Sequence, residues 1–457
     1  MNILINFISN QRFEVQLNFI KNLNKNSNIK IFIFISDKIK KENVIKLFKS
    51  DFKILNYEDN KIKHNLKKIL LITKLLSIIK LIFFNLSLVQ LIYEYMHLRK
   101  LNKFYLYSKK IIIENNIDLI FSNSDRSAEL ENSILKAARE LEIPIIVPYL
   151  TLLAEYSVLI KSKKQNKINS LYNIFLSFKF KKYQIQKKDF YPFFIMNALY
   201  KFGTLSKNPW IMGNGYSDII CCNNTYTYQQ FINDGVDEKK LIVTGDVSYD
   251  EIFLNLKNKN KNKNSFYKKN NIDFHKKNIL VALPQLAEDG IMPWNQHWEE
   301  VNFICNSLDK LNANILISLH PKMNIDKYKF LEGKFNLKII KQNLSTSIPY
   351  ADLFIATYSS TILWSILCKI NTIVIDFYNL DRSFYNSLKS PRLFKKKSEY
   401  ISFIENQPFK KKFFDEDLNL LSFQKTFDGN VINRYIDLIF KITNEKNIHN
   451  SRDRQFT

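Results

Sequence analysis

Short apolar runs alternate with helix-length segments along the first 150 residues of the chain. The runs predict strands and the segments between them predict helices. The predicted strands are 2–8, 29–36, 51–56, 117–121 and 143–148, and the predicted helices are 12–25 and 127–141. Strands that alternate with helices build a parallel sheet with helices on both faces. The first part of the chain is therefore predicted to form a doubly wound α/β domain.

The same alternation returns near residue 218 and continues to about residue 376. The predicted strands there are 218–222, 240–244, 278–283, 314–319, 337–340, 352–356 and 372–376, and the predicted helices are 225–233, 297–311, 324–332, 360–368 and 430–443. At 457 residues the chain is too long for a single ordinary core. We expect an α/β protein with two Rossmann-like, doubly wound parallel-sheet domains that face each other across a cleft.

The division into domains follows from where these patterns stop. We expect an N-terminal domain over 1–255 with helical insertions at about 60–115 and 155–215, a polar linker over 256–276, a second domain over 277–430, and a C-terminal helix and tail over 431–457. The linker contains the run NLKNKNKNKNS, which predicts a solvated and flexible segment. The final helix is expected to cross back to the first domain.

The chain carries a net charge of +25, and lysine and asparagine dominate its polar positions. The composition of an AT-rich genome would produce this surplus without any function. The functional explanation is that the positive charge attracts an anionic membrane or acidic substrates. The sequence does not decide between the compositional and the functional explanation. No nucleic-acid-binding motif is visible, so no nucleic-acid partner is expected.

Residues 68–93 bear on the membrane question. Lys74 and Lys80 interrupt their apolar run, so a membrane-spanning helix is not expected. A helical hairpin packed on the domain and a helix lying in the membrane surface both fit the pattern.

The four cysteines give no metal-ligand spacing. They are Cys221, Cys222, Cys305 and Cys368, all in apolar runs, and they are expected to be buried thiols in a reducing cytoplasm. Met1 leads directly into a strand-like run rather than a signal peptide. We therefore expect a cytoplasmic protein, with association at the inner membrane face as the alternative, and no metal site.

An acidic turn follows the predicted strand 278–283. Glu288 and Asp289 precede Gly290, which permits a tight reversal, and Gln285 lies between the strand and this turn. A carboxylate within reach of an acceptor hydroxyl acts as a general base, and we favour Asp289 over Glu288 for this role. An exposed acidic turn without any function would show the same residues.

A histidine closes the predicted strand 314–319. Pro321 ends the strand ladder directly after His320. At that position the imidazole can donate to a departing phosphate, and Lys322 adds positive charge. A histidine that only packs in the core is the alternative.

Hydroxyl groups follow the predicted strand 352–356 and open a helix. Tyr358, Ser359, Ser360 and Thr361 place hydroxyls and free backbone N–H groups together, which suits a phosphate. The same residues also suit simple helix capping. Ligands of open α/β sheets bind outside the carboxyl ends of the strands, so the acidic turn, the histidine and these hydroxyls are expected to converge there.

Together these three motifs resemble the set found in bacterial sialyltransferases and related nonulosonate or capsule transferases of GT-B type. The resemblance covers roughly residues 279–380. It implies that Asp289 is the base, that His320 contacts the leaving phosphate, and that Ser359 and Ser360 contact the nucleotide phosphate. It also implies a nucleotide-sugar donor, no further cofactor, and a surface polysaccharide or glycolipid as acceptor.

A second segment is similar to the interdomain region of hydrolysing UDP-N-acetylglucosamine 2-epimerases. Val243-Thr244-Gly245-Asp246 precedes Tyr249-Asp250, and Gly245 is a candidate nucleotide-binding residue on this resemblance. Those epimerases usually carry Asp-Ser-Gly-Gly where this chain has residues 357–360. UDP-sugar and GDP-sugar transferases of this fold often place a glutamate on the next helix, but 361–370 contain no acid. Both departures favour a CMP-linked donor over a UDP-linked one.

The sequence therefore predicts a GT-B glycosyltransferase that is inverting and metal-independent and acts in capsule or lipopolysaccharide synthesis. A nucleotide-sugar epimerase is one alternative. A polysaccharide-assembly protein of the same fold that binds without catalysis is the other.

Overall fold

The computed structural model describes residues 1–7, 19–35, 53–56, 87–128, 130–149, 170–320, 323–380 and 383–453. Half of the predicted helix 12–25, most of the segment 68–93 and the start of the second insertion lie outside the described residues, as do Pro321 and Lys322.

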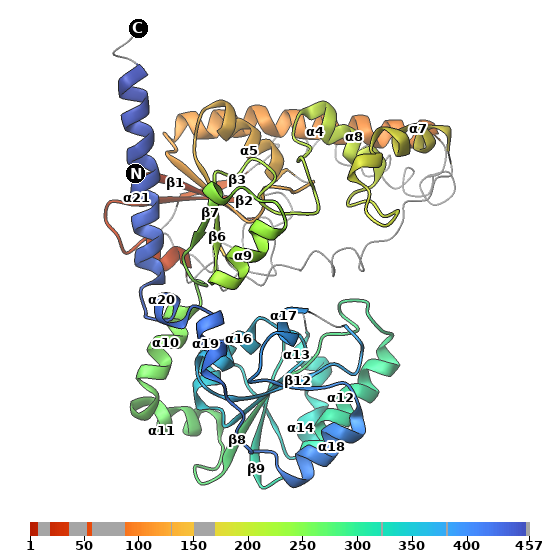
Figure 1. The fold of residues 1–457 in the computed structure, drawn as a ribbon, viewed down its shortest axis with the longest axis vertical. Helices are drawn as coiled ribbons and strands as arrows, with labels where there is room; N and C mark the ends of the chain where they lie inside the picture. The colour runs from red at the N-terminus through yellow and green to blue at the C-terminus, as the bar shows by residue number, and fades with distance from the viewer. Residues whose placement is uncertain are drawn as a thin grey trace.

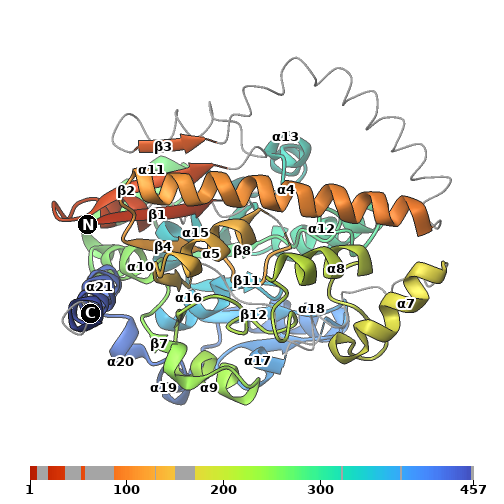
Figure 2. The ribbon, with the colours of Figure 1, turned by 90° about the horizontal axis from the view of Figure 1, so that it is seen from above.

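The first sheet has seven parallel strands in the order β3-β2-β1-β4-β5-β6-β7. They are β1 (Asn2–Phe7), β2 (Lys30–Ile35), β3 (Lys53–Asn56), β4 (Leu119–Ser122), β5 (Ile145–Val147), β6 (Ile219–Cys222) and β7 (Leu241–Val243). The helices of this lobe are α4 (Ser87–Glu114), α5 (Glu131–Glu140), α7 (Leu171–Lys179), α8 (Phe193–Phe202) and α9 (Thr225–Asn233). Helices α4 and α5 pack on one face of the sheet (Figures 1 and 2).

The second sheet has six parallel strands in the order β10-β9-β8-β11-β12-β13. They are β8 (Lys277–Ala282), β9 (Ala313–Ser318), β10 (Lys338–Ile339), β11 (Leu353–Ala356), β12 (Asn371–Ile375) and β13 (Arg392–Phe394). Its helices are α12 (Trp294–Asp309), α13 (Ile325–Tyr328), α14 (Phe330–Lys334), α15 (Leu344–Ser347), α16 (Thr361–Leu367), α17 (Ser383–Asn386), α18 (Lys397–Asn406) and α19 (Asp415–Leu420). Two doubly wound parallel sheets confirm the predicted fold class.

Strand β13 was not predicted from the sequence. Its three residues pair with β12 in parallel at the sheet edge. Pro391 precedes it and three lysines follow Phe394, so the apolar run is too short to stand out. This short segment forms a strand because it pairs with the neighbouring strand β12, and not because of its own sequence.

The polar run between the lobes is helical, which corrects the expectation of a flexible linker. Helices α10 (Tyr249–Lys257) and α11 (Lys259–Asn270) occupy it. Phe266 and Tyr267 at the end of α11 are buried, and the Phe266 ring stacks on Tyr350 with centroids 4.3 Å apart. These two aromatic side chains hold the helix against the second lobe although its remaining residues are polar.

The C-terminal helix α21 (Val431–Asp453) returns to the first lobe, and the short α20 (Phe423–Thr426) precedes it (Figure 1). The Tyr435 ring meets Phe19 and Phe121 edge-on, and its hydroxyl accepts the backbone N–H of Tyr149 at 3.0 Å. The Asp250 carboxylate of α10 accepts the first two backbone N–H groups of α21, at 2.8 and 2.9 Å. This carboxylate satisfies N–H groups that have no partner within the helix.

All four cysteines are buried and unpaired, as the sequence predicts. Burial raises the pKa of the Cys221 thiol to about 12. In the described part of the chain, no helix has both the length and the apolar character needed to cross a bilayer.

Candidate functional site

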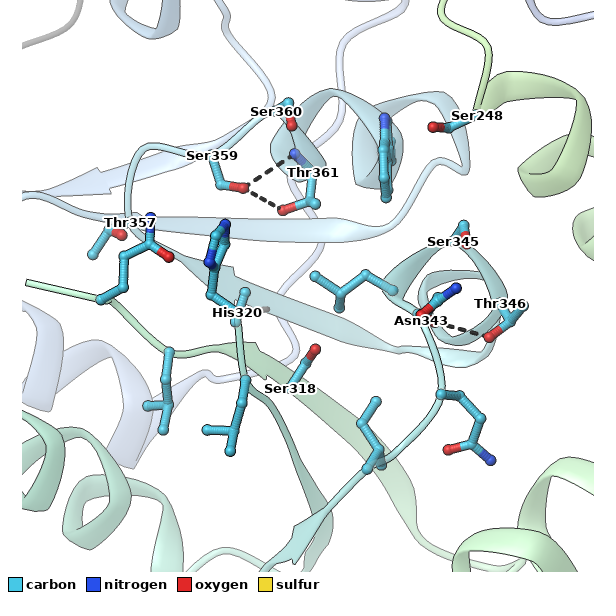
Figure 3. A pocket seen from close by; sticks show the side chains of 18 of the residues that line it. Ser248, Ser318, His320, Asn343, Ser345, Thr346, Thr357, Ser359, Ser360 and Thr361 are labelled. Carbon is cyan, nitrogen blue, oxygen red and sulfur yellow. Dashed lines mark hydrogen bonds between the residues drawn. The ribbon is translucent and has the colours of Figure 1, made fainter. Parts of the chain in front are cut away.

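A cavity of about 960 Å³ lies between the two lobes at the carboxyl ends of the strands of the second sheet. Loops of the second lobe line it after β8, β9, β10, β11 and β12. Asn22 and Ser248 of the first lobe and residues of α10 also line it. Figure 3 shows side chains from these loops around the cavity. The predicted site residues that line it are Gln285, Asp289, His320, Tyr358, Ser359, Ser360 and Thr361.

The loop after β8 presents Asp289 to the cavity. The Asp289 backbone N–H donates to the Gln285 carbonyl at 3.0 Å, and the Gln285 side-chain amide donates to Asp289 Oδ2 at 2.9 Å. Gly290 has a φ of +69°, a conformation that glycine adopts without strain, and it does not line the cavity. The turn therefore holds an exposed carboxylate at the cavity wall.

Glu288 does not line the cavity, although it precedes Asp289. Its Oε1 accepts the Tyr328 hydroxyl at 2.7 Å, and that hydroxyl lies 2.7 Å from Nε2 of the buried His297. Burial lowers the pKa of His297, and burial together with the Glu288 carboxylate raises the pKa of Tyr328. Glu288 thus anchors the acidic loop to α12 and α13.

His320 lies two residues after the end of β9 and is half-buried at the cavity wall. Its backbone N–H donates to the Met323 sulfur at 3.2 Å. In Figure 3 the imidazole points toward the loop that carries Thr357 and Ser359. The structure therefore brings His320 to the same cavity as the hydroxyl motif.

The hydroxyl motif after β11 both caps a helix and lines the cavity. Ser359 Oγ accepts the Thr361 backbone N–H at 3.3 Å and lies 2.9 Å from Thr361 Oγ1. Ser360 also lines the cavity. The Tyr358 hydroxyl donates to Asp376 Oδ2 at 3.0 Å inside the second lobe, so this hydroxyl ties β11 to β12. Ser359, Ser360 and Thr361 all lie at the cavity wall.

Sequence reasoning missed the wall after β10. This wall is formed by Lys341, Gln342, Asn343, Ser345 and Thr346. The polar run Lys-Gln-Asn directly after a strand was the available signal, by the same strand-end argument that selected His320. Exposed Lys341 brings a positive charge to the cavity.

Gly245 lies away from the cavity, against the C-terminal segment. Its φ is +96°, and a Cβ there would lie 2.9 Å from Val431 Cγ2. The glycine therefore permits close packing of β7 on α20 and α21. The neighbouring Asp246 is 2% exposed, and burial raises its pKa to about 6 although the Ser248 N–H donates to its Oδ1 at 2.8 Å.

No group of three histidine, cysteine, aspartate or glutamate side chains is arranged to hold a metal ion among the residues that the structure describes.

Solved structures with the same architecture span nearly the whole chain. The UDP-GlcNAc 2-epimerase of Methanocaldococcus jannaschii, in complex with UDP-GlcNAc and UDP, has 14% identity and a TM-score of 0.53, covering 96% of this chain and 100% of that one. The wall teichoic acid polymerase TagF, as its H444N variant with CDPG, has 13% identity and a TM-score of 0.53, covering 97% and 89%. A glycosyltransferase from Rickettsia africae has 13% identity and a TM-score of 0.51, covering 96% and 98%.

Searches against protein-family models and against curated proteins found no match. At these identities the structural similarities establish the fold alone. The chain therefore has the GT-B architecture of nucleotide-sugar transferases and 2-epimerases.

Proposed function

We propose that the protein is a glycosyltransferase that moves a sugar from a nucleotide donor to an acceptor hydroxyl. The observation that carries this proposal is the single cavity lined by Asp289, His320 and Ser359, which come from three separate strand-end loops. A carboxylate, an imidazole and hydroxyls around one space of about 960 Å³ suit an activated sugar and the hydroxyl that attacks it.

The proposed reaction is a single displacement at the anomeric carbon. The Asp289 carboxylate removes the proton of the acceptor hydroxyl while its oxygen forms the new glycosidic bond. The bond between the sugar and the phosphate oxygen breaks, and the electron pair leaves with the nucleotide. His320 and the Ser359 and Ser360 hydroxyls donate to that phosphate, and Lys341 adds positive charge. The configuration at the anomeric carbon inverts, and we expect no metal to be needed.

For the donor we propose a CMP-linked nonulosonic acid. Helix α16 carries no acid that would hold the ribose of a UDP-linked or GDP-linked sugar. A surface polysaccharide or glycolipid is the proposed acceptor. Thermal-shift measurements with CMP, UDP, GDP and their sugars test this choice, and stabilisation by UDP without stabilisation by CMP would overturn it.

Adjacent acids offer a matched test of the catalytic role. We expect Asp289→Asn to lower kcat by at least about 100-fold with little change in the KM for the donor, because only the general base is lost. Glu288→Gln should instead lower the melting temperature, because it weakens the bond to Tyr328. Nucleotide release in the presence of membrane-derived glycan acceptors measures the rate. The opposite outcome, a slow Glu288→Gln enzyme and an unaffected Asp289→Asn enzyme, would refute the assignment.

A nucleotide-sugar 2-epimerase is the second candidate. It is favoured by the segment from Val243 to Asp250 and by the epimerase of the same fold that was solved with UDP-GlcNAc and UDP. Formation of free ManNAc from UDP-GlcNAc with no acceptor present would select this function over transfer.

A further inference from the structure

The first lobe carries a helical arm that is built around one buried carboxylate. We define the arm as residues 87–103 of α4 together with residues 170–203, which include α7 and α8. Glu94 is 3% exposed; its carboxylate accepts the Tyr172 hydroxyl, the Asn197 side-chain amide at 2.9 Å and Lys201 Nζ at 2.6 Å. The three helices are thereby fixed to one another.

Helix α7 turns an apolar stripe toward solvent. Leu171, Ile174, Phe175 and Phe178 are 82%, 42%, 63% and 73% exposed. Their spacing of three, four and seven residues places them on one face of the helix. The opposite face is also apolar and packs on the arm, where Leu176 is fully buried. The outer stripe therefore contributes nothing to the arm's own core.

The start of α4 also exposes apolar side chains, and we call these and the α7 stripe together the patch. Leu88, Leu91, Ile92, Tyr95 and Met96 are between 39% and 68% exposed. The Ser170 hydroxyl donates to the Gln90 side chain at 3.2 Å, so the start of α7 lies against the start of α4. Figure 2 shows both at the same end of the first lobe. Many large exposed apolar side chains gathered at one end of a lobe indicate an interaction surface.

The positive charge of the arm distinguishes between two possible partners of the patch, a second copy of the chain and an anionic bilayer. The basic residues of the arm are Arg99, Lys100, Lys103, Lys179, Lys181, Lys182, Lys187, Lys188 and Lys201. Its acids are Glu94 and Asp189, and both are buried. A second copy of the chain would bring the same positive charge to the contact. An anionic bilayer supplies the opposite charge and an apolar interior.

We propose that the arm docks the protein on an anionic lipid surface. The stripe of α7 and the start of α4 enter the boundary between headgroups and acyl chains, and the surrounding lysines contact lipid phosphates. The protein then lies on the bilayer without crossing it. This inference does not depend on the donor or on the reaction proposed above.

Vesicle cosedimentation of the full-length protein tests the proposal. We expect at least tenfold stronger partitioning onto vesicles with 30% phosphatidylglycerol than onto pure phosphatidylcholine, and a much smaller difference in 1 M NaCl, where the screening length falls to about 3 Å. Lys181→Gln with Lys182→Gln should weaken binding to the anionic vesicles on the order of twentyfold.

Removing exposed phenylalanines of α7 tests whether the apolar stripe contributes to membrane binding. Phe175→Ser with Phe178→Ser should weaken binding to both vesicle types by about tenfold or more. The control is Phe330→Ser, an exposed phenylalanine of the second lobe, 44% exposed, which should bind as the wild type does. Unchanged melting temperatures verify folding of each variant.

Two results would overturn the proposal. One is equal binding of the wild type and the Phe175/Phe178 double variant to anionic vesicles. The other is a wild-type protein that ignores vesicles but forms dimers that this double variant abolishes, which would assign the patch to a second copy of the chain.

Discussion

Asp246 is a carboxylate buried between the end of β7 and the start of α10, where Trp364 approaches it from the second lobe. Burial raises its pKa from 3.8 to about 6. We predict that Asp246→Asn stabilises the protein at neutral and alkaline pH. The amide removes the buried charge and keeps an oxygen that accepts the Ser248 backbone N–H.

The direction in which stability changes with pH follows from the protonation of Asp246 in the folded and the unfolded protein. Between about pH 4 and pH 6 the folded protein holds a proton on Asp246 that the unfolded chain has released, so stability falls as the pH rises through this range. A shift of about two pKa units corresponds to about 3 kcal/mol of unfavourable free energy above pH 6. Below about pH 4 both states are protonated, and this cost disappears.

Thermal unfolding of both proteins across pH 4 to pH 8 measures the effect. At pH 8 we expect the Asp246→Asn variant to melt about 5 °C higher, and near pH 4 we expect the two curves to coincide. Asp237→Asn is the matched control, because exposed Asp237 also accepts the backbone N–H of the second residue after it, Lys239, at 3.0 Å. A variant that melts lower than the wild type at pH 8, or a difference that does not depend on pH, would refute the reasoning.

Two further predictions concern backbone packing in the first lobe. Gly245→Ala should lower the free energy of unfolding by about 1–3 kcal/mol, because the Cβ strains a backbone with positive φ and comes too close to Val431. The control is Gly333→Ala in α14, which has open space around it and should be neutral or slightly stabilising. Equal effects of the two substitutions in chemical denaturation would contradict this prediction. Asp125→Ala should lower the free energy of unfolding by about 2–4 kcal/mol, because the buried carboxylate accepts two glycine backbone N–H groups and the Ser217 hydroxyl. A change below about 0.5 kcal/mol in the same assay would rule out that role.

Most strands were predictable because strands of a parallel sheet are covered on both faces. Burial on both faces produces continuous apolar runs, as in Ile279–Val281 and Leu353–Ala356, and such runs are visible without any partner. Helix α11 was not predictable in this way, because its stability rests on Phe266 and Tyr267 packing against the second lobe. Strand β13 likewise depends on the neighbour with which it pairs.

The site was predictable in outline because the end of a strand fixes where the next residues emerge. His320 and Ser359 reach one cavity for this reason. The sequence analysis favoured Asp289 over Glu288 but could not place either side chain, since adjacent residues in a turn point in different directions. The bond from Tyr328 to Glu288 settles which of the two faces away from the cavity.

The sequence by itself determined the two α/β units, most of their strands and the order of the chemical groups at the strand ends, because periodicity and burial are local consequences of side-chain polarity. Only the tertiary structure decided that Gly245 serves packing rather than the cavity, and that Lys341 joins the wall. These features depend on contacts between segments that lie far apart in the chain, such as Gly245 and Val431. No local pattern encodes such contacts, because each depends on a partner brought near by the rest of the fold.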